Sequence, residues 1–286
     1  MALKLEQGQA ATAGVASLAA NGGTAQTGAL GLNGPAVSFS GSAFTFGSDP
    51  GYGYGRVESV MPNCATPFLA GLGDSYTLGT SSTGSCVGAT STTPLLAQST
   101  SGATSTEASG WYSSSGSVAF GGRSQVLAFM FRLPNASDYA SGTSLRIGAG
   151  FASATGCNGS GGNWTTVIGT DAPTSCSAAY IRYSNNAGDA EYQLVTCNAT
   201  ACNVTAFSSS FTPSTSLTQC VIAYNSGTNV SAACGVVGGT QYTAASTTDL
   251  PGAVAMAPIF FNMDAATTAT HIQVGSVLGY DPGSSY

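Results

Sequence analysis

Hydrophobic and polar residues alternate with a period of two over most of the chain beyond Met61. Such alternation is typical of β-strands, in which successive side chains point to opposite faces of a sheet. The strongest example is the run SQVLAFMFRL at 124–133, followed at once by Pro134, which cannot donate to a strand ladder. One face of this strand would be lined by Leu127, Phe129, Phe131 and Leu133. Since most residues between them are apolar as well, the pattern predicts a strand in the middle of a sheet.

Other short apolar runs follow one another at roughly 10- to 15-residue spacing, separated by Gly, Ser and Asn. They are TPFLAGL, TPLLAQST, GWYSSSGSVAFGG, SLRIGAGFAS, WTTVIGT, AAYIRYS, EYQLVT, NVTAFS, LTQCVIAY, VSAACGVV, MAPIFFNM and HIQVGSVLGY. No segment shows a convincing helical period, and no repeat of fixed length indicates a propeller or solenoid. The pattern predicts an all-β domain over residues 57–286, built as an antiparallel β-sandwich.

Residues 1–56 differ from the rest in being rich in Ala, Gly, Thr and Gln, with few large apolar side chains in the first thirty positions. Such a segment cannot bury a core of its own. The run 37–46, VSFSGSAFTF, nevertheless alternates well enough to add a strand to something. Two interpretations stay open: a flexible tail, or an extended N-terminal arm that becomes ordered against a neighbouring subunit. In the second case the interface residues would be Val37, Phe39, Phe44, Phe46, Tyr52 and Tyr54.

Composition narrows the possible partners. Charged residues make up 6% of the chain, compared with roughly a quarter in an average soluble domain. The formal net charge of −6 argues against a nucleic-acid partner and against recruitment to an anionic membrane, both of which need a basic patch. No apolar run approaches the ~18 residues that would cross a bilayer. The hydrophobic fraction of 43% still provides for a sizeable core.

The chain has eight cysteines and a single histidine, His271. Zinc sites need clustered cysteine pairs and usually histidine, so this composition favours disulfides over a metal. Two pairs flank hairpin-like stretches, which would place their members nearly opposite each other. The expected bonds are Cys220–Cys234 and Cys197–Cys202 from these hairpins, with Cys157–Cys176 and Cys64–Cys86 as the remaining local pairs.

The order of the strands carries a resemblance. The series GGRSQVLAFMFRLPN, SLRIGAGF, AAYIRYS, YQLVT, LTQCVIAYNSGTNVSAACG and MAPIFFNMDAATTATHIQVGSVLGY resembles the concanavalin-like (laminin-G-like) jelly-roll domains of tailed-phage virion proteins, over roughly residues 60–283. The chain departs from that family in its cysteines and in LTQCVIAY, where a tryptophan and charged residues are usual. The resemblance implies a capsid cement or decoration protein that binds the outer capsid surface, or alternatively a head or tail fibre that recognises a host glycan.

The same resemblance implies the major capsid protein as a partner and self-association, most simply as a homotrimer. The N-terminal stretch MALKLEQGQAATAG lacks the apolar core of a signal peptide, with Glu6 where that core should be. We therefore expect synthesis in the host cytoplasm without a signal peptide and a final place on the virion. Release by lysis would let the cysteines oxidise outside the cell.

Candidate chemistry is sparse. Asp189 and Glu191 would share one face of a strand and could serve a glycoside hydrolase, yet Leu194 stands where a third carboxylate should be, and the favoured interpretation is a solvated strand end. His271 lies in an alternating run with nothing to mark a partner, so a structural role is expected. The sequence predicts no enzyme, no cofactor and no metal site. Aromatic residues that could stack on a sugar or anchor a protein interface are Tyr52, Tyr54, Trp111, Tyr112 and Trp164.

Overall fold

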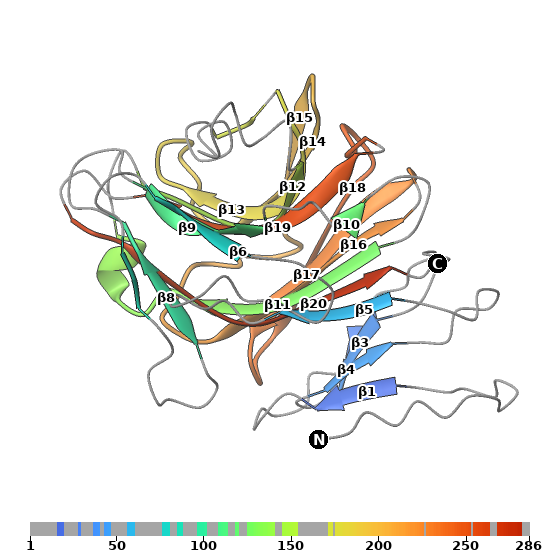
Figure 1. The fold of residues 1–286 in the computed structure, drawn as a ribbon, viewed down its shortest axis with the longest axis horizontal. Coiled ribbons are helices and arrows are strands. Elements are labelled where there is room, and N and C mark those ends of the chain that lie inside the picture. Colours follow the sequence, from blue (N-terminus) through green and yellow to red (C-terminus); the bar gives the residue numbers. More distant parts are fainter. Residues whose placement is uncertain are drawn as a thin grey trace, which may run out of the picture.

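The computed structural model describes the strands before residue 90 and most of the chain from residue 96 to 281. The described ranges are 16–19, 28–29, 37–40, 43–46, 56–60, 76–80, 85–87, 96–101, 108–113, 118–119, 125–140, 145–153, 171–173, 175–225, 227–252, 254–263 and 268–281. Described by their backbone alone are the strands up to residue 87, residues 108–113 apart from Gly110, residues 118–119 and 278–281, and Ala97, Gln125, Asn225, Ala255, Ala257 and Ser276. The predicted all-β antiparallel sandwich is confirmed, because every strand pairing is antiparallel and two large sheets face each other (Figure 1).

The first large sheet, here called the β12 sheet, has eight strands. Their order is β15-β14-β13-β12-β19-β9-β6, and β10 also pairs with β19. The bounds are β6 Tyr76–Thr80, β9 Ala108–Ser113, β10 Val118–Ala119, β12 Arg146–Ser153, β13 Ser177–Ser184, β14 Gln193–Asn198, β15 Cys202–Ala206 and β19 Ala255–Met263.

The second large sheet, the β11 sheet, also has eight strands. Their order is β18-β17-β16-β11-β20-β8-β7, and β5 also pairs with β20. The bounds are β5 Arg56–Val60, β7 Ser85–Val87, β8 Ala97–Thr100, β11 Gln125–Arg132, β16 Thr218–Asn225, β17 Asn229–Val236, β18 Gln241–Ser246 and β20 His271–Asp281. A short 3₁₀ turn, η1 (Ala136–Asp138), follows β11. Among the described residues, no helix is long and apolar enough to cross a membrane.

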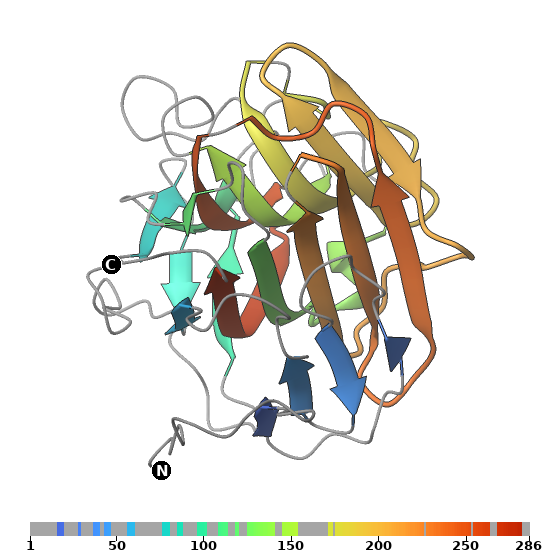
Figure 2. The same ribbon diagram turned by 90° about the vertical axis from the view of Figure 1, so that its right-hand side faces the viewer.

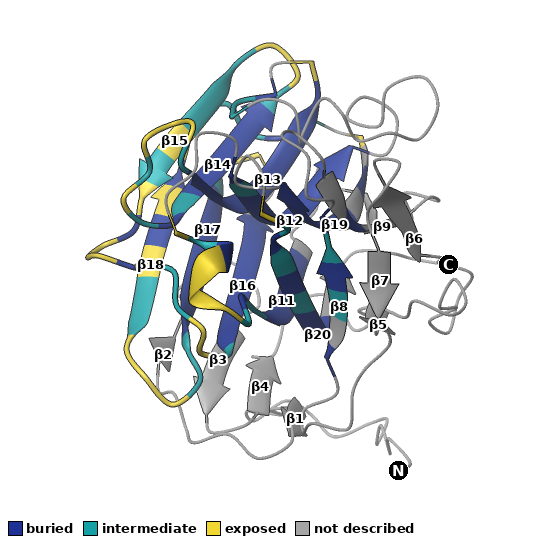
Figure 3. Cartoon of the chain, turned by 90° about the vertical axis from the view of Figure 1, so that its left-hand side faces the viewer, coloured by how far each residue is buried: buried dark blue, intermediate teal, exposed yellow. Residues whose placement is uncertain are grey.

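The strand predicted at 124–133 lies at the centre of the β11 sheet, where β11 pairs with β16 on one side and β20 on the other. Its large apolar face packs into the main core between the two sheets. Phe129 is fully buried there and meets Phe260 of β19 edge to face, with ring centroids 5.3 Å apart. The burial pattern shows the same arrangement, with the central strands buried and β15 and β18 partly exposed (Figure 3).

Both hairpin disulfides predicted from the sequence are confirmed. Cys220 and Cys234 lie opposite each other in β16 and β17, and Cys197 and Cys202 lie opposite each other in β14 and β15, each pair with Cα atoms 4.1 Å apart. Cys176 is disulfide-bonded as well. Cys64 and Cys157 lie outside the described residues, and Cys86 is described by its backbone in β7 alone.

We expect the two hairpin disulfides to contribute unequally. In the chain-entropy model a crosslink stabilises more when it closes a longer loop, about 3 kcal/mol for Cys220–Cys234 and about 2 kcal/mol for Cys197–Cys202. Their sequence separations are 14 and 5 residues. Urea unfolding of the two double cysteine-to-serine variants measures the difference. A larger loss of unfolding free energy on removing Cys197–Cys202 than on removing Cys220–Cys234 would contradict this expectation.

The N-terminal segment contains a separate small sheet with the order β1-β4-β3-β2. Its strands are β1 Ala16–Ala19, β2 Gly28–Ala29, β3 Val37–Ser40 and β4 Ala43–Phe46. The run 37–46 is therefore a hairpin and not one strand, in keeping with its central Gly-Ser pair, which suits a two-residue turn. The first strand that joins a large sheet is β5, which begins at Arg56. Tyr52, Tyr54 and Trp164 lie outside the described residues.

The three sheets lie in layers. In Figures 1 and 2 the β12 sheet and the β11 sheet form the sandwich, and the backbone of β1–β4 lies on the outer side of the β11 sheet. The ends of β11 and the start of β20 meet at one end of the β11 sheet, because these strands run antiparallel beside each other. That end carries the first of two polar clusters described next.

Candidate functional site

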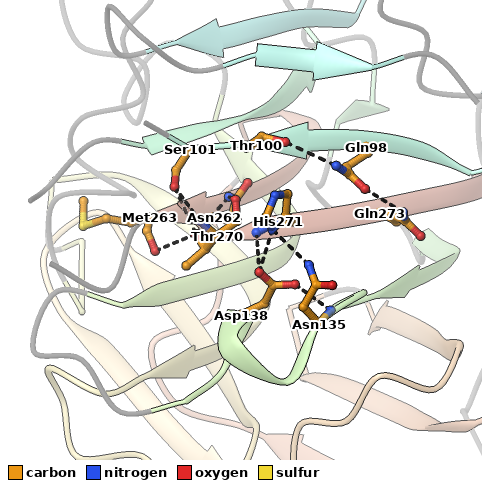
Figure 4. A network of polar contacts seen from close by, with 10 residues as sticks. All are labelled: Gln98, Thr100, Ser101, Asn135, Asp138, Asn262, Met263, Thr270, His271 and Gln273. Atoms are coloured by element: carbon orange, nitrogen blue, oxygen red, sulfur yellow. Dashed lines mark hydrogen bonds and ion pairs between the residues drawn. The ribbon is translucent and has the colours of Figure 1, made fainter. Parts of the chain in front are cut away.

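The single histidine has a partner that the sequence did not reveal. His271 is the first residue of β20, and its Nδ1 lies 2.7 Å from Oδ1 of Asp138, the last residue of η1 (Figure 4). The carboxylate is completely buried, while the imidazole keeps 23% of its side-chain surface exposed. The amide nitrogen of Asn135 lies 3.3 Å from the same Nδ1. These three residues form the Asp138–His271 site.

Asp138 is held by backbone donors as well as by the imidazole. Its Oδ2 accepts a hydrogen bond from the backbone N–H of Asn135 at 2.8 Å, and its Oδ1 accepts one from the backbone N–H of His271 at 3.0 Å. The first contact completes a capping box at η1, with Asn135 and Asp138 three residues apart. The carboxylate therefore joins the turn after β11 to the start of β20.

Hydroxyl and amide groups extend this site into the sheet. Thr270, next to His271, donates from its hydroxyl to the carbonyl oxygen of Met263 and receives the side-chain amide of Asn262 on its own carbonyl oxygen at 2.7 Å. The hydroxyl of Ser101 lies 3.2 Å from that of Thr270 and accepts the Thr270 backbone N–H (Figure 4). These contacts are buried, so they fix the strand ends rather than present groups to solvent.

The chemistry open to the Asp138–His271 site is limited. The carboxylate orients the imidazole through Nδ1, which leaves Nε2 without a protein partner in the part of the chain that the structure describes. Such a nitrogen can donate or accept one hydrogen bond. A nucleophile would have to lie within hydrogen-bond reach of it, and the described contacts of the Ser101 hydroxyl are to Thr270. The geometry supports hydrogen bonding to a ligand better than nucleophilic catalysis.

A second polar cluster lies at the β13–β14 connection and corrects the expectation for Asp189. This residue does not lie in a strand with Glu191, because a turn over Asn185–Gly188 ends β13 first, and Gly188 takes a left-handed φ of 76°. The carboxylate instead pairs with Arg182 through two 2.8 Å bonds, Nε to Oδ2 and Nη2 to Oδ1. Both side chains are nearly buried, with 6% and 7% of their surface exposed. Asp189 is a buried counter-ion and not a solvated strand end.

Asp171 gathers a second set of donors beside this pair. Its carboxylate accepts hydrogen bonds from Arg146 at 2.8 Å and from the side chains of Ser184 and Asn186. Burial by itself raises the pKa of this carboxyl, but the bonds from Arg146, Ser184 and Asn186 and the charge of Arg146 outweigh it, and the pKa lies below its ordinary value of 3.8.

This shift predicts a pH dependence. A carboxyl whose pKa is lowered by folding contributes stability above its ordinary pKa, and that contribution is lost as pH falls through the folded value. The difference in unfolding free energy between the wild type and Asp171→Asn should therefore be largest above about pH 5 and shrink below about pH 4. Urea unfolding of both proteins across this range measures it, and a difference that grows on acidification would contradict the assignment.

The remaining candidates divide between the described and undescribed parts of the chain. Trp111 and Tyr112 lie in β9, which is described by its backbone alone. Among the described residues, none bonds to the side chain of Glu191. Within the described ranges, no three His, Cys, Asp or Glu side chains are gathered to hold a metal ion. Asp138 was not among the residues predicted from the sequence. The feature that could have indicated it is the three-residue spacing of Asn135 and Asp138 directly after Pro134, which is typical of a capped turn.

No protein-family model matches the chain, and no curated protein matches it either. Among solved structures, a protein of unknown function from Shewanella oneidensis MR-1 is similar over 81% of this chain and 90% of its own, with a TM-score of 0.54 and 14% identity. Peanut lectin is similar over 79% of this chain and 97% of its own, with a TM-score of 0.47 and 12% identity. An alginate lyase from Aplysia kurodai covers 71% and 86%, with a TM-score of 0.45 and 12% identity. At 14% identity the first of these similarities shows the fold alone, a β-sandwich of two antiparallel sheets.

Proposed function

We propose that this chain is a non-enzymatic structural protein of a virion, a capsid decoration or cement subunit that binds the outer capsid surface and stabilises it. The observation that carries the proposal is the set of contacts that the described charged side chains make. Each of them is bonded to another side chain within the molecule, apart from Glu191. The ion pairs of Arg182 with Asp189 and of Arg146 with Asp171 hold the fold, and the partly exposed His271 ring is better placed to hydrogen-bond a ligand than to act as a general base on a described nucleophile.

Three further features support the same function. The strand series resembles that of tailed-phage virion domains, as set out above. The disulfides stabilise a domain that has few charges to form surface ion pairs. A low-charge surface of hydroxyl and amide groups also suits close contact between neighbouring subunits, since charged residues are depleted at the centre of protein interfaces. The major capsid protein and two further copies of this chain, as a homotrimer, are the partners that this proposal names.

The copy number in purified particles tests the proposal. A decoration subunit is present in hundreds of copies per particle, whereas a fibre is present in a few to some tens, so a stained gel of virions calibrated against the major capsid protein separates the two. We expect a band that corresponds to hundreds of copies per particle. Particles from which the chain has been removed should lose heat resistance. Absence of the chain from purified particles would overturn the proposal.

A second candidate is a module that recognises a host glycan. The observation that favours it is the exposed edge of the Asp138–His271 site, where Nε2 of a carboxylate-oriented imidazole lies beside the exposed Asn135. Groups of this kind can bind sugar hydroxyls. Titration of the full chain with glycans from the host surface, followed by the NMR signal of the His271 ring, tests it. Binding that is unchanged in His271→Ala would exclude this edge as the glycan site.

A further inference from the structure

The outer face of the β11 sheet is largely apolar and buried, although it points away from the main core. Alternate residues of β11, β16 and β17 fill that core, so the residues between them lie on the outer face. Met130, Gln219 and Ser231 on this face are 4–8% exposed, and five smaller apolar residues are 0–2% exposed and belong to neither core cluster of the described side chains. We call them the outer patch: Val126, Ala128, Val221, Ala223 and Ala233.

The burial of the outer face of the β11 sheet ends between β17 and β18. The strand registers place Ala128, Val221 and Ala233 in one row across β11, β16 and β17, and Thr243 of β18 continues the same row. The first three are at most 1% exposed, whereas Thr243 is exposed. An antiparallel sheet that faces water carries polar residues on its outer side. The outer patch does not, so something covers the sheet from β11 to β17 and stops short of β18.

The small sheet of β1–β4 is the element in position to cover it. Figures 1 and 2 place its backbone on this side of the sandwich. Its strands hydrogen-bond with one another and with no strand of either large sheet. The registers pair Val37 with Phe46 and Phe39 with Phe44, and residues that are paired across antiparallel strands share a face. The small sheet therefore has one strongly apolar face.

We propose that this apolar face of the small sheet packs on the outer patch and makes the N-terminal segment a third layer of the fold. The side chains of the outer patch are all alanine or valine, so its surface is nearly flat, which suits the packing of one sheet on another. Because no strand of the small sheet pairs with a strand of the β11 sheet, apolar packing holds the two sheets together. The sequence GSDPGYGYG at 47–55, which connects the small sheet to β5 and contains four glycines, is here called the tether.

Cleavage of the tether tests the proposal in the full-length protein. A protease recognition sequence is inserted after Gly51, the folded chain is cut, and the products are separated by gel filtration. We expect residues 1–51 to remain bound to the sandwich after cleavage, with low fluorescence of the apolar dye ANS. Release of the fragment from the cut wild type, with or without dye binding to the sandwich, would overturn the proposal.

Two matched variants identify the face. Phe39→Ser with Phe44→Ser changes the proposed contact face, and Ser38→Ala with Thr45→Ala changes the opposite face of the same paired strands. After cleavage, the first variant should bind its fragment at least about 100-fold more weakly and expose the outer patch to the dye, since two large apolar groups leave the contact. The second should retain its fragment. Equal retention by both variants would contradict the assigned face, and the sandwich itself is untouched in either.

Discussion

Asp189→Ala should reduce the free energy of unfolding by about 3–5 kcal/mol, because it leaves the guanidinium of Arg182 buried without its counter-ion. Arg182 is 5% exposed, and both bonds of its fork go to the Asp189 carboxylate. Its remaining partner is the backbone carbonyl oxygen of Asp171, which carries no full charge. The backbone N–H of Ser184 also loses its bond to Asp189. Urea unfolding followed by tyrosine fluorescence measures the loss.

Two controls separate a buried ion pair from a general effect of removing a carboxylate. Glu191→Gln should change stability by no more than about 0.5 kcal/mol, since no side chain in the described part of the structure bonds to Glu191. The double variant Arg182→Met with Asp189→Leu should recover most of the loss, because it replaces both charges by apolar groups of similar volume. An Asp189→Ala protein as stable as the wild type would show that the pair does not stabilise the fold.

Asp138→Ala should cost a similar amount, about 3–5 kcal/mol, for a different reason. The fully buried carboxylate accepts three hydrogen bonds, from the backbone N–H groups of Asn135 and His271 and from the His271 ring. Each buried donor left without a partner costs about 1–3 kcal/mol. The ring is partly exposed and can turn to water, so the two backbone groups account for most of the loss.

The ranking of variants at this site checks that explanation. His271→Ala removes one donor and leaves the carboxylate with its two backbone partners, so a loss of about 1 kcal/mol is expected. Asp138→Asn keeps one acceptor oxygen and should lie between the two alanine variants. Thermal unfolding of the three proteins gives the order, and an Asp138→Ala protein more stable than His271→Ala would contradict it.

The fold could be predicted from the sequence where local pattern determines it. Both faces of β11 are apolar, which indicated a central strand, and the short loops within Cys197–Cys202 and Cys220–Cys234 indicated hairpins. The separate sheet of β1–β4 was not predicted. Its strands are short, and their pairing depends on the Gly-Ser break within 37–46, which the continuous alternation of that run conceals.

The polar clusters were beyond sequence analysis for a related reason. Asp138 and His271 are 133 residues apart, and only the neighbouring positions of β11 and β20 bring them together. The pair of Asp189 with Arg182 is closer in sequence, seven residues apart, but a strand was assumed through Asp189. Gly188, with its left-handed φ, marked the turn that ends this strand and sends the carboxylate back to the guanidinium.

The last two strands of the chain occupy interior positions in the two large sheets. β19 lies between β12 and β9, and β20 lies between β11 and β8. Until the ribosome has made residues 255–281, β11 and β12 each lack a neighbour on one side, and the strands that precede them in the chain have no sheet to join. Long-range pairings of this kind form slowly and leave strand edges open while they form. We therefore expect the two sheets to close only after residues 255–281 have left the ribosome, with chaperones protecting the open strand edges until then.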